Sequence, residues 1–172
     1  MLAFFRCIRR LEEFLISFGI LAIAGLTATN VVTRTGFGHS LAFAEELCQF
    51  LIVMITFVGA SYAAGHGRHI RMTALYDQLS HDWKRRLMIS SCVLTALLMF
   101  ALTVFAVAYL NTLRALGTIS PVLRVPLYLV YITAPLGLLM TGLQFCLTAF
   151  KNLGSPDKIY ISYDVEDGAD PL

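Results

Sequence analysis

The sequence has few charged residues, and four long stretches of it have none. Lys, Arg, Asp and Glu make up 14% of the 172 residues, hydrophobic residues make up 58%, and the mean hydropathy is +0.73. A soluble domain averages about 25% charged and about 45–50% apolar residues. One globule of this size cannot bury that surplus of apolar surface, so the composition indicates an integral membrane protein.

Several other classes are excluded by what is missing. The net charge is only +2 and no basic stripe is interleaved with aromatic residues, so nucleic acid is not an expected partner. The cysteines stand singly in four different segments, and no two have metal-ligand or redox-motif spacing. No metal site, disulfide framework or cofactor is therefore predicted.

Catalysis within the membrane is also disfavoured, because no Asp, Glu, Lys, Arg or His lies at the middle of an apolar stretch. All four histidines lie in connections or at the ends of these stretches, whereas a haem held by two histidines needs them at membrane depth. No serine–histidine or paired-aspartate arrangement suits an intramembrane protease. The chain is not expected to be an enzyme.

The charge-free stretches predict an all-α integral membrane protein with four transmembrane helices. Each is long enough for the roughly 20 apolar residues that cross a bilayer core. The predicted spans are about 14–33, 45–65, 87–111 and 125–150. We expect them to form one domain over residues 1–153, followed by an acidic cytoplasmic tail over residues 154–172 that is disordered.

The N-terminal segment has a second interpretation as a cleaved signal, because arginines precede its apolar run and residues 22–24 (Ala-Ile-Ala) resemble a cleavage site. The run continues to Thr33, however, beyond the roughly 7–15 residues of a signal core. An uncleaved helix is favoured. Cleavage would leave three spans and another orientation.

Orientation follows from the short connections, because Lys and Arg are enriched on the cytoplasmic side. With the N-terminus inside, ten of these residues are cytoplasmic and three are outside. The outer three are Arg34, Arg114 and Arg124. Both termini are therefore predicted to be cytoplasmic.

The inner connection between the second and third spans has an amphipathic pattern. Its apolar residues share one helical face: Met72, Leu75, Tyr76, Leu79 and Trp83. This predicts a short helix in the cytoplasmic interface, anchored by Trp83 and the basic residues 84–86.

Polar residues at the outer ends of the first two spans are candidates for a structural or interface role. Glu45 and Glu46 suit a helix N-terminus, and this capping role has about even weight with an inward-turned carboxylate that pairs with Arg34 or Arg124. Adjacent helical residues point about 100° apart, so one glutamate can face solvent and the other protein. For Asn30, contact with headgroups is favoured over a hydrogen bond across helices.

At the inner end of the second span, Arg68, His69 and Arg71 stand among glycines. Two interpretations have equal weight: attraction of the basic residues to anionic membrane lipids, and a specific structural or inter-subunit role.

The order of the short motifs resembles the small membrane subunit of tripartite ATP-independent periplasmic (TRAP) transporters over about residues 10–150. The matching segments are 30–34 (NVVTR), 44–47 (AEEL), 58–61 (VGAS), 67–71 (GRHIR), 120–126 (SPVLRVP) and 131–137 (YITAPLG). Thr35 departs from the aromatic residue that more often follows the arginine, which weakens inference about anchoring there.

The resemblance implies a multi-pass protein of the bacterial inner membrane. It implies a sodium-coupled importer of organic acids, of the dicarboxylate or sugar-acid type, to which a periplasmic binding protein delivers substrate. A large membrane subunit would carry the transport site and move as an elevator, and this small subunit would be its stationary scaffold. Two alternatives stay open: a homo-oligomeric small transporter, and an assembly subunit of another membrane complex.

Overall fold

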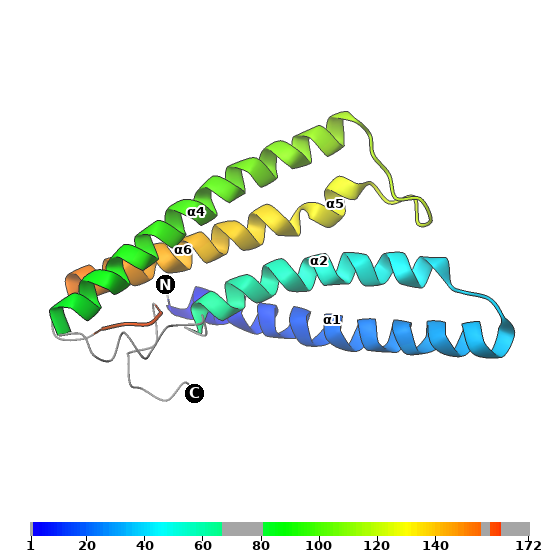
Figure 1. The fold of residues 1–172 in the computed structure, drawn as a ribbon, viewed down its shortest axis with the longest axis horizontal. Helices are drawn as coiled ribbons and strands as arrows, with labels where there is room; N and C mark the ends of the chain where they lie inside the picture. The colour runs from blue at the N-terminus through cyan, green and yellow to red at the C-terminus, as the bar shows by residue number, and fades with distance from the viewer. Residues whose placement is uncertain (1, 67–80, 156–158, 163–172) are drawn as a thin grey trace. The chain divides into compact units, whose positions relative to one another are not determined.

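The computed structural model describes residues 2–66, 81–155 and 159–162, without the side chains of residues 2–9, 81 and 82. The described residues are almost entirely helical (Figure 1). The helices are α1 (Leu2–Phe37), α2 (Ala42–Gly65), α4 (His81–Ala115), α5 (Leu127–Tyr131) and α6 (Thr133–Gly154).

Four helical segments of the described chain are long and apolar enough to cross a membrane, which confirms the predicted fold class. They are Arg10–Phe37, Ala42–Gly65, Trp83–Ala115 and Leu127–Gly154. Most extend beyond the predicted limits, because the absence of charge marks only the part of a helix in hydrocarbon. The backbone continues as helix into the headgroup region, where charged side chains are tolerated.

The fourth span differs from the single helix that was predicted over 125–150. It consists of α5 and α6, separated at Ile132. Pro135 lies in the first turn of α6. A proline has no N–H to donate to the carbonyl four residues earlier, which here belongs to Tyr131, and the proline ring clashes with that carbonyl. The helix is therefore interrupted next to Tyr131.

The predicted interfacial helix lies mostly in residues 67–80, outside the described residues. Its last member, Trp83, is in the first turn of α4, where its side chain is exposed. The Arg86 guanidinium carbon lies 5.8 Å from the centre of the Trp83 ring.

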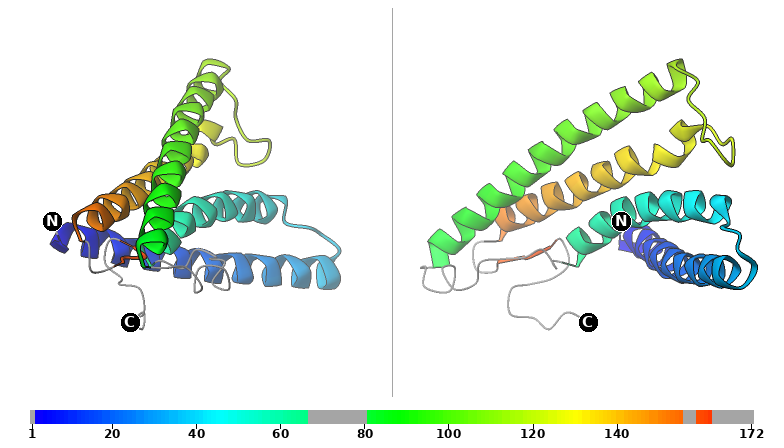
Figure 2. Two further views of the ribbon diagram at one scale, coloured as in Figure 1. Left: turned by 60° about the vertical axis from the view of Figure 1, so that its left-hand side comes forward. Right: turned by 45° about the vertical axis from the view of Figure 1, so that its right-hand side comes forward.

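The chain divides into two compact units. Unit 1 comprises Met1–Gly59 and Val104–Leu136, and unit 2 comprises Ala60–Thr103 and Gly137–Leu172. In unit 1, α1 and α2 run side by side in opposite directions (Figures 1 and 2). They approach closely at Gly19, where an added Cβ would lie 2.8 Å from Cδ1 of Ile55.

In unit 2, the first part of α4 packs against α6. A Cβ at Gly142 would lie 3.2 Å from the Phe100 ring. Near the ends of these helices, Met88, Cys92, Ala149 and Ile159 form a buried apolar cluster. Ile159 comes from the predicted tail; the acidic residues of that tail lie outside the described residues.

Candidate functional site

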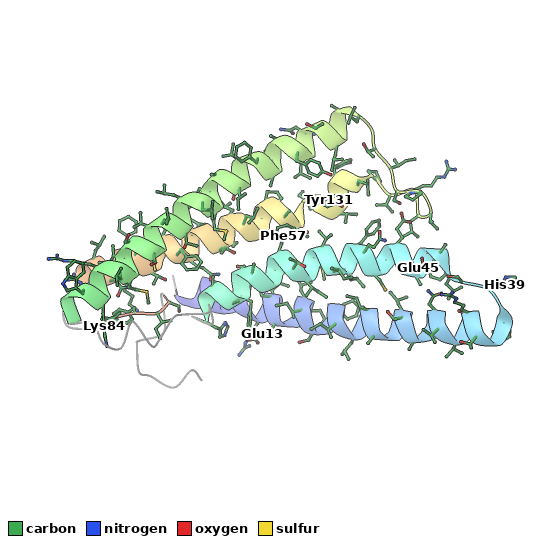
Figure 3. All side chains as sticks on the ribbon, viewed as in Figure 1. Glu13, His39, Glu45, Phe57, Lys84 and Tyr131 are labelled. Atoms are coloured by element: carbon green, nitrogen blue, oxygen red, sulfur yellow. The ribbon has the colours of Figure 1, made fainter. Side chains whose placement is uncertain are left out.

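A polar cluster in unit 1 joins the end of α1 to the start of α2. The Asn30 amide donates to Oε1 of Glu45 at 3.3 Å, and the Ser40 hydroxyl donates to the same oxygen at 3.1 Å. The Leu41 backbone N–H donates to Oδ1 of Asn30 at 2.7 Å. Asn30 thus uses its donor and its acceptor to hold the connection against the helix ends. Figure 3 shows Glu45 on α2 near the connection that carries His39.

The local sequence explains this geometry. Gly38 follows α1 with a φ of 71°, the left-handed conformation that commonly ends a helix and that glycine adopts without strain. The chain then reverses over few residues, and Glu45 falls in the first turn of α2, where the helix dipole favours an acidic side chain.

Glu46 points in another direction and is 6% exposed. Its Oε2 accepts a hydrogen bond of 2.6 Å from the backbone N–H of Leu123, in the connection between α4 and α5. A backbone N–H bound to a carboxylate is a charge-assisted hydrogen bond, about twice as strong as a neutral one. Glu46 therefore fixes the start of α2 to a segment 77 residues later in the chain.

The connection that Glu46 holds is a tight loop over residues 118–127. The Ser120 N–H donates to the Val125 carbonyl at 2.9 Å, and the Val125 N–H donates back to the Ser120 hydroxyl at 3.1 Å. The Leu127 N–H donates to the Thr118 carbonyl at 3.0 Å. Between these contacts, Arg124 has a φ of 55°, in the left-handed region that favours glycine.

The two glutamates thus divide as the helical geometry predicted, with Glu46 buried and Glu45 exposed. The predicted ion pair with Arg34 or Arg124 is not formed: both arginines are exposed, and neither has an ion pair in the part of the chain that the structure describes. Both carboxylates accept hydrogen bonds from nearer donors instead. The preference for Asn30 in contact with headgroups was wrong, since it bonds across helices to Glu45.

A half-open cavity of about 350 Å³ lies in unit 1 beside these carboxylates. Its lining includes Glu45, Glu46, Gln49, Phe50, Pro121 and Tyr131. Its lining combines polar and apolar side chains. Among the described residues, no group of three His, Cys, Asp or Glu could hold a metal ion.

Sequence reasoning missed a second polar cluster, in unit 2. Thr141, Gln144, Thr148 and Asn152 are all buried on α6. The Gln144 amide donates to the Ser61 hydroxyl of α2 at 3.1 Å. The signal was present in the sequence: these residues recur at helical spacing and form one polar face on an otherwise apolar span.

Asn152 is fully buried and holds a short segment that follows α6. Its amide donates to the Tyr160 carbonyl at 2.8 Å, and its oxygen accepts from the Tyr160 N–H at 2.8 Å. The Ser162 hydroxyl donates to the last carbonyl of α2, at Gly65, at 2.7 Å. Arg85 donates to the carbonyls of Asn152 and Leu153 and so satisfies the end of α6. Arg68, His69 and Arg71 lie outside the described residues, so their predicted roles stay predictions.

A family model for tripartite ATP-independent periplasmic transporters, DctQ component, matches residues 23–154. The chain belongs to this family. The match confirms the resemblance drawn from the motifs, and it covers the polar cluster of unit 1 as well as the polar face of α6. The members of this family are components of transporters, and the family is not one of enzymes.

The similar proteins include three TRAP small permeases. The chain is 45% identical over 161 residues to the ectoine TRAP transporter small permease protein TeaB of Halomonas elongata, which covers 94% of this chain and 83% of the relative. It is 25% identical over 133 residues to the C4-dicarboxylate TRAP transporter small permease protein DctQ of Rhodobacter capsulatus, a match that covers 77% of this chain and 59% of the relative. It is 33% identical over 54 residues to a putative TRAP transporter small permease protein of Haemophilus influenzae, a match that covers 31% of this chain and 34% of the relative.

Proposed function

We propose that this TRAP small permease is a scaffold subunit that supports a large membrane subunit and contributes no residue to the transport site. The observation that carries the proposal is that buried polar side chains of the described residues bond within the subunit, with Oε1 of Gln144 as the exception. The buried carboxylate of Glu46 accepts from a backbone N–H, and the buried amide of Asn152 holds a backbone segment. A transport pathway would instead require polar groups facing a water-filled cavity at membrane depth.

The proposed setting is a bacterial inner membrane with both termini in the cytoplasm. Its partners are the large subunit, a periplasmic substrate-binding protein and membrane lipids. The ten-to-three distribution of Lys and Arg supports this orientation.

We propose sodium-coupled uptake on the basis of the resemblance alone. For the substrate, the stronger similarity is to the ectoine permease, at 45% identity against 25% for the C4-dicarboxylate permease. We therefore propose ectoine as the first substrate to test, ahead of dicarboxylates and sugar acids. The substrate should be selected by the binding protein and the large subunit.

Purification and uptake test the proposal together. The tagged small subunit should co-purify with a large multi-span protein, and proteoliposomes with both subunits and the binding protein should take up labelled ectoine when a sodium gradient is imposed. Omission of the small subunit should abolish uptake. A homodimer that transports alone, or full uptake by the large subunit without this chain, would contradict the scaffold role.

A further inference from the structure

The cavity of unit 1 is lined by polar groups that make no hydrogen bond within the described chain. Glu46 is 6% exposed, and only its Oε2 accepts a hydrogen bond, from the Leu123 N–H. Its Oε1 accepts none from the residues that the structure describes, and the Gln49 amide and the Tyr131 hydroxyl make none with them either. A carboxylate has about four lone-pair sites, and buried polar groups are normally satisfied. The unused oxygen of Glu46 therefore indicates a place for a donor in the cavity.

The charge of the lining indicates what kind of donor fits. Glu45 and Glu46 both line the cavity, and no Lys, Arg or His among the described residues does. The donors that these carboxylates bind inside the subunit are uncharged, namely Asn30, Ser40 and the Leu123 N–H. A carboxylate held away from water is stabilised most by a cation that also donates hydrogen bonds.

The cavity follows α2 from the boundary of the membrane toward the hydrocarbon. Its lining on α2 begins at Ala42, the first residue of the span, and ends at Val53, about 17 Å further along the helix axis. The two carboxylates belong to the outer turns, and Phe50 and Val53 follow them along the helix. Leu127 and Val130 of α5 add further apolar lining. A ligand that fits has a polar group at the boundary and an apolar part.

The walls of the cavity are fixed by contacts within unit 1. Oε2 of Glu46 holds the loop that carries Pro121, which lines the cavity. The Tyr131 ring packs edge-on against the Tyr109 ring, with centres 5.8 Å apart. The volume of about 350 Å³ falls within the roughly 300–1,000 Å³ of small-molecule sites. The site is therefore large enough for a small ligand and has fixed walls on both α2 and the α4–α5 loop.

We propose that this cavity binds an organic ammonium group that carries a hydrocarbon chain. The three N–H donors of a primary ammonium match Oε1 of Glu46, the Glu45 carboxylate and the Gln49 carbonyl oxygen. The aromatic side chains of Phe50 and Tyr131 also attract cations. Such a ligand has two sources, a membrane lipid with an ethanolamine headgroup and a free alkylamine in solution. The lipid is the expected occupant, because the lining continues along the span.

Native mass spectrometry of the delipidated complex of small and large subunits tests this assignment. The probes are phosphatidylethanolamine, phosphatidylcholine and phosphatidylglycerol with identical short acyl chains, and hexylamine. Phosphatidylethanolamine should bind about tenfold more tightly than phosphatidylcholine, whose ammonium has no N–H, and than the anionic phosphatidylglycerol. Glu46→Gln should weaken binding of phosphatidylethanolamine about tenfold, because the charge is lost, and Gln49→Leu about threefold, because an acceptor is lost.

Two variants separate the site from effects on the fold. Glu13→Gln is the matched control, since it removes the same charge from an exposed carboxylate of α1 that does not line the cavity, and it should leave binding unchanged (Figure 3). Gln49→Leu removes no hydrogen bond of the described chain, so its effect on binding reports the cavity alone.

The probes also separate the two sources of the ligand. Binding of hexylamine but not of phosphatidylethanolamine, with the same dependence on Glu46 and Gln49, would support the ammonium site and assign it to a soluble amine. Equal binding of the three lipids, or binding that neither Glu46→Gln nor Gln49→Leu changes, would overturn the proposal. So would a wild-type complex that binds no probe and loses its large subunit in Glu46→Gln, since a basic side chain of the partner would then fill the cavity.

Discussion

Removal of the Glu46 carboxylate should loosen the α4–α5 connection. Glu46→Ala leaves the N–H of the half-buried Leu123 without its acceptor, and an unsatisfied donor away from water costs about 1–3 kcal/mol. The lost side chain also leaves a void at a site that is 6% exposed. A local loss of about 2–3 kcal/mol corresponds to a roughly 30–150-fold larger population of the open loop.

Hydrogen exchange of the amides in residues 120–125 measures that opening in the assembled complex. Glu46→Gln keeps an acceptor but loses its charge, so it should cost about 1 kcal/mol, the difference between charge-assisted and neutral hydrogen bonds. Glu45→Ala is the matched control, because its carboxylate is exposed and its donors can turn to water. Protection of the loop that is unchanged in Glu46→Ala, or lost equally in Glu45→Ala, would refute the reasoning.

Further predictions concern single contacts. Asn30→Leu should lower the free energy of unfolding by about 1–2 kcal/mol, measured by thermal or denaturant unfolding of the complex, because the Leu41 N–H and Glu45 each lose a partner. Gly19→Leu should separate α1 from α2 and lower the yield of assembled complex, whereas Gly19→Ala should do so less. Asn152→Ala should expose residues 159–162 to proteolysis in inverted vesicles, since both hydrogen bonds to Tyr160 are lost. A single reporter cysteine at Gly36 should be labelled from outside intact cells and one at Ser155 should not; the reverse would refute the proposed orientation.

The four spans could be predicted from sequence because charged side chains are excluded from the hydrocarbon core whatever the tertiary contacts of a helix are. Their ends could not, since a helix continues past the last apolar residue until its backbone finds another partner. The break at Ile132 had a signal in Pro135, but a proline near the start of a helix is also tolerated, and sequence alone does not separate the two cases.

The hydrogen-bond partners of the candidate residues were less predictable. Opposite charges suggested that Arg34 pairs with a glutamate, yet the carboxylate of Glu46 bonds to a backbone N–H from a distant loop. Every backbone group is a possible partner, and only the tertiary fold brings a particular one near. The polar face of α6 was predictable in principle, because the spacing places four polar residues on one side of an apolar span, and polar side chains at membrane depth face protein rather than lipid.

Among the described residues, buried polar side chains supply many of the internal contacts, beside the buried apolar cluster of unit 2. In the most apolar part of each of the first three spans, only 6%, 11% and 6% of the residues are buried. The share is 33% in the fourth span, which carries the polar face of α6. Lipid is as apolar as a leucine side chain, so an uncovered apolar helix has no penalty in a bilayer, whereas an unpaired amide there is costly. The polar residues therefore fix the helix ends to one another and leave long apolar surfaces uncovered. Such surfaces suit a subunit whose proposed role is to pack against a larger membrane protein.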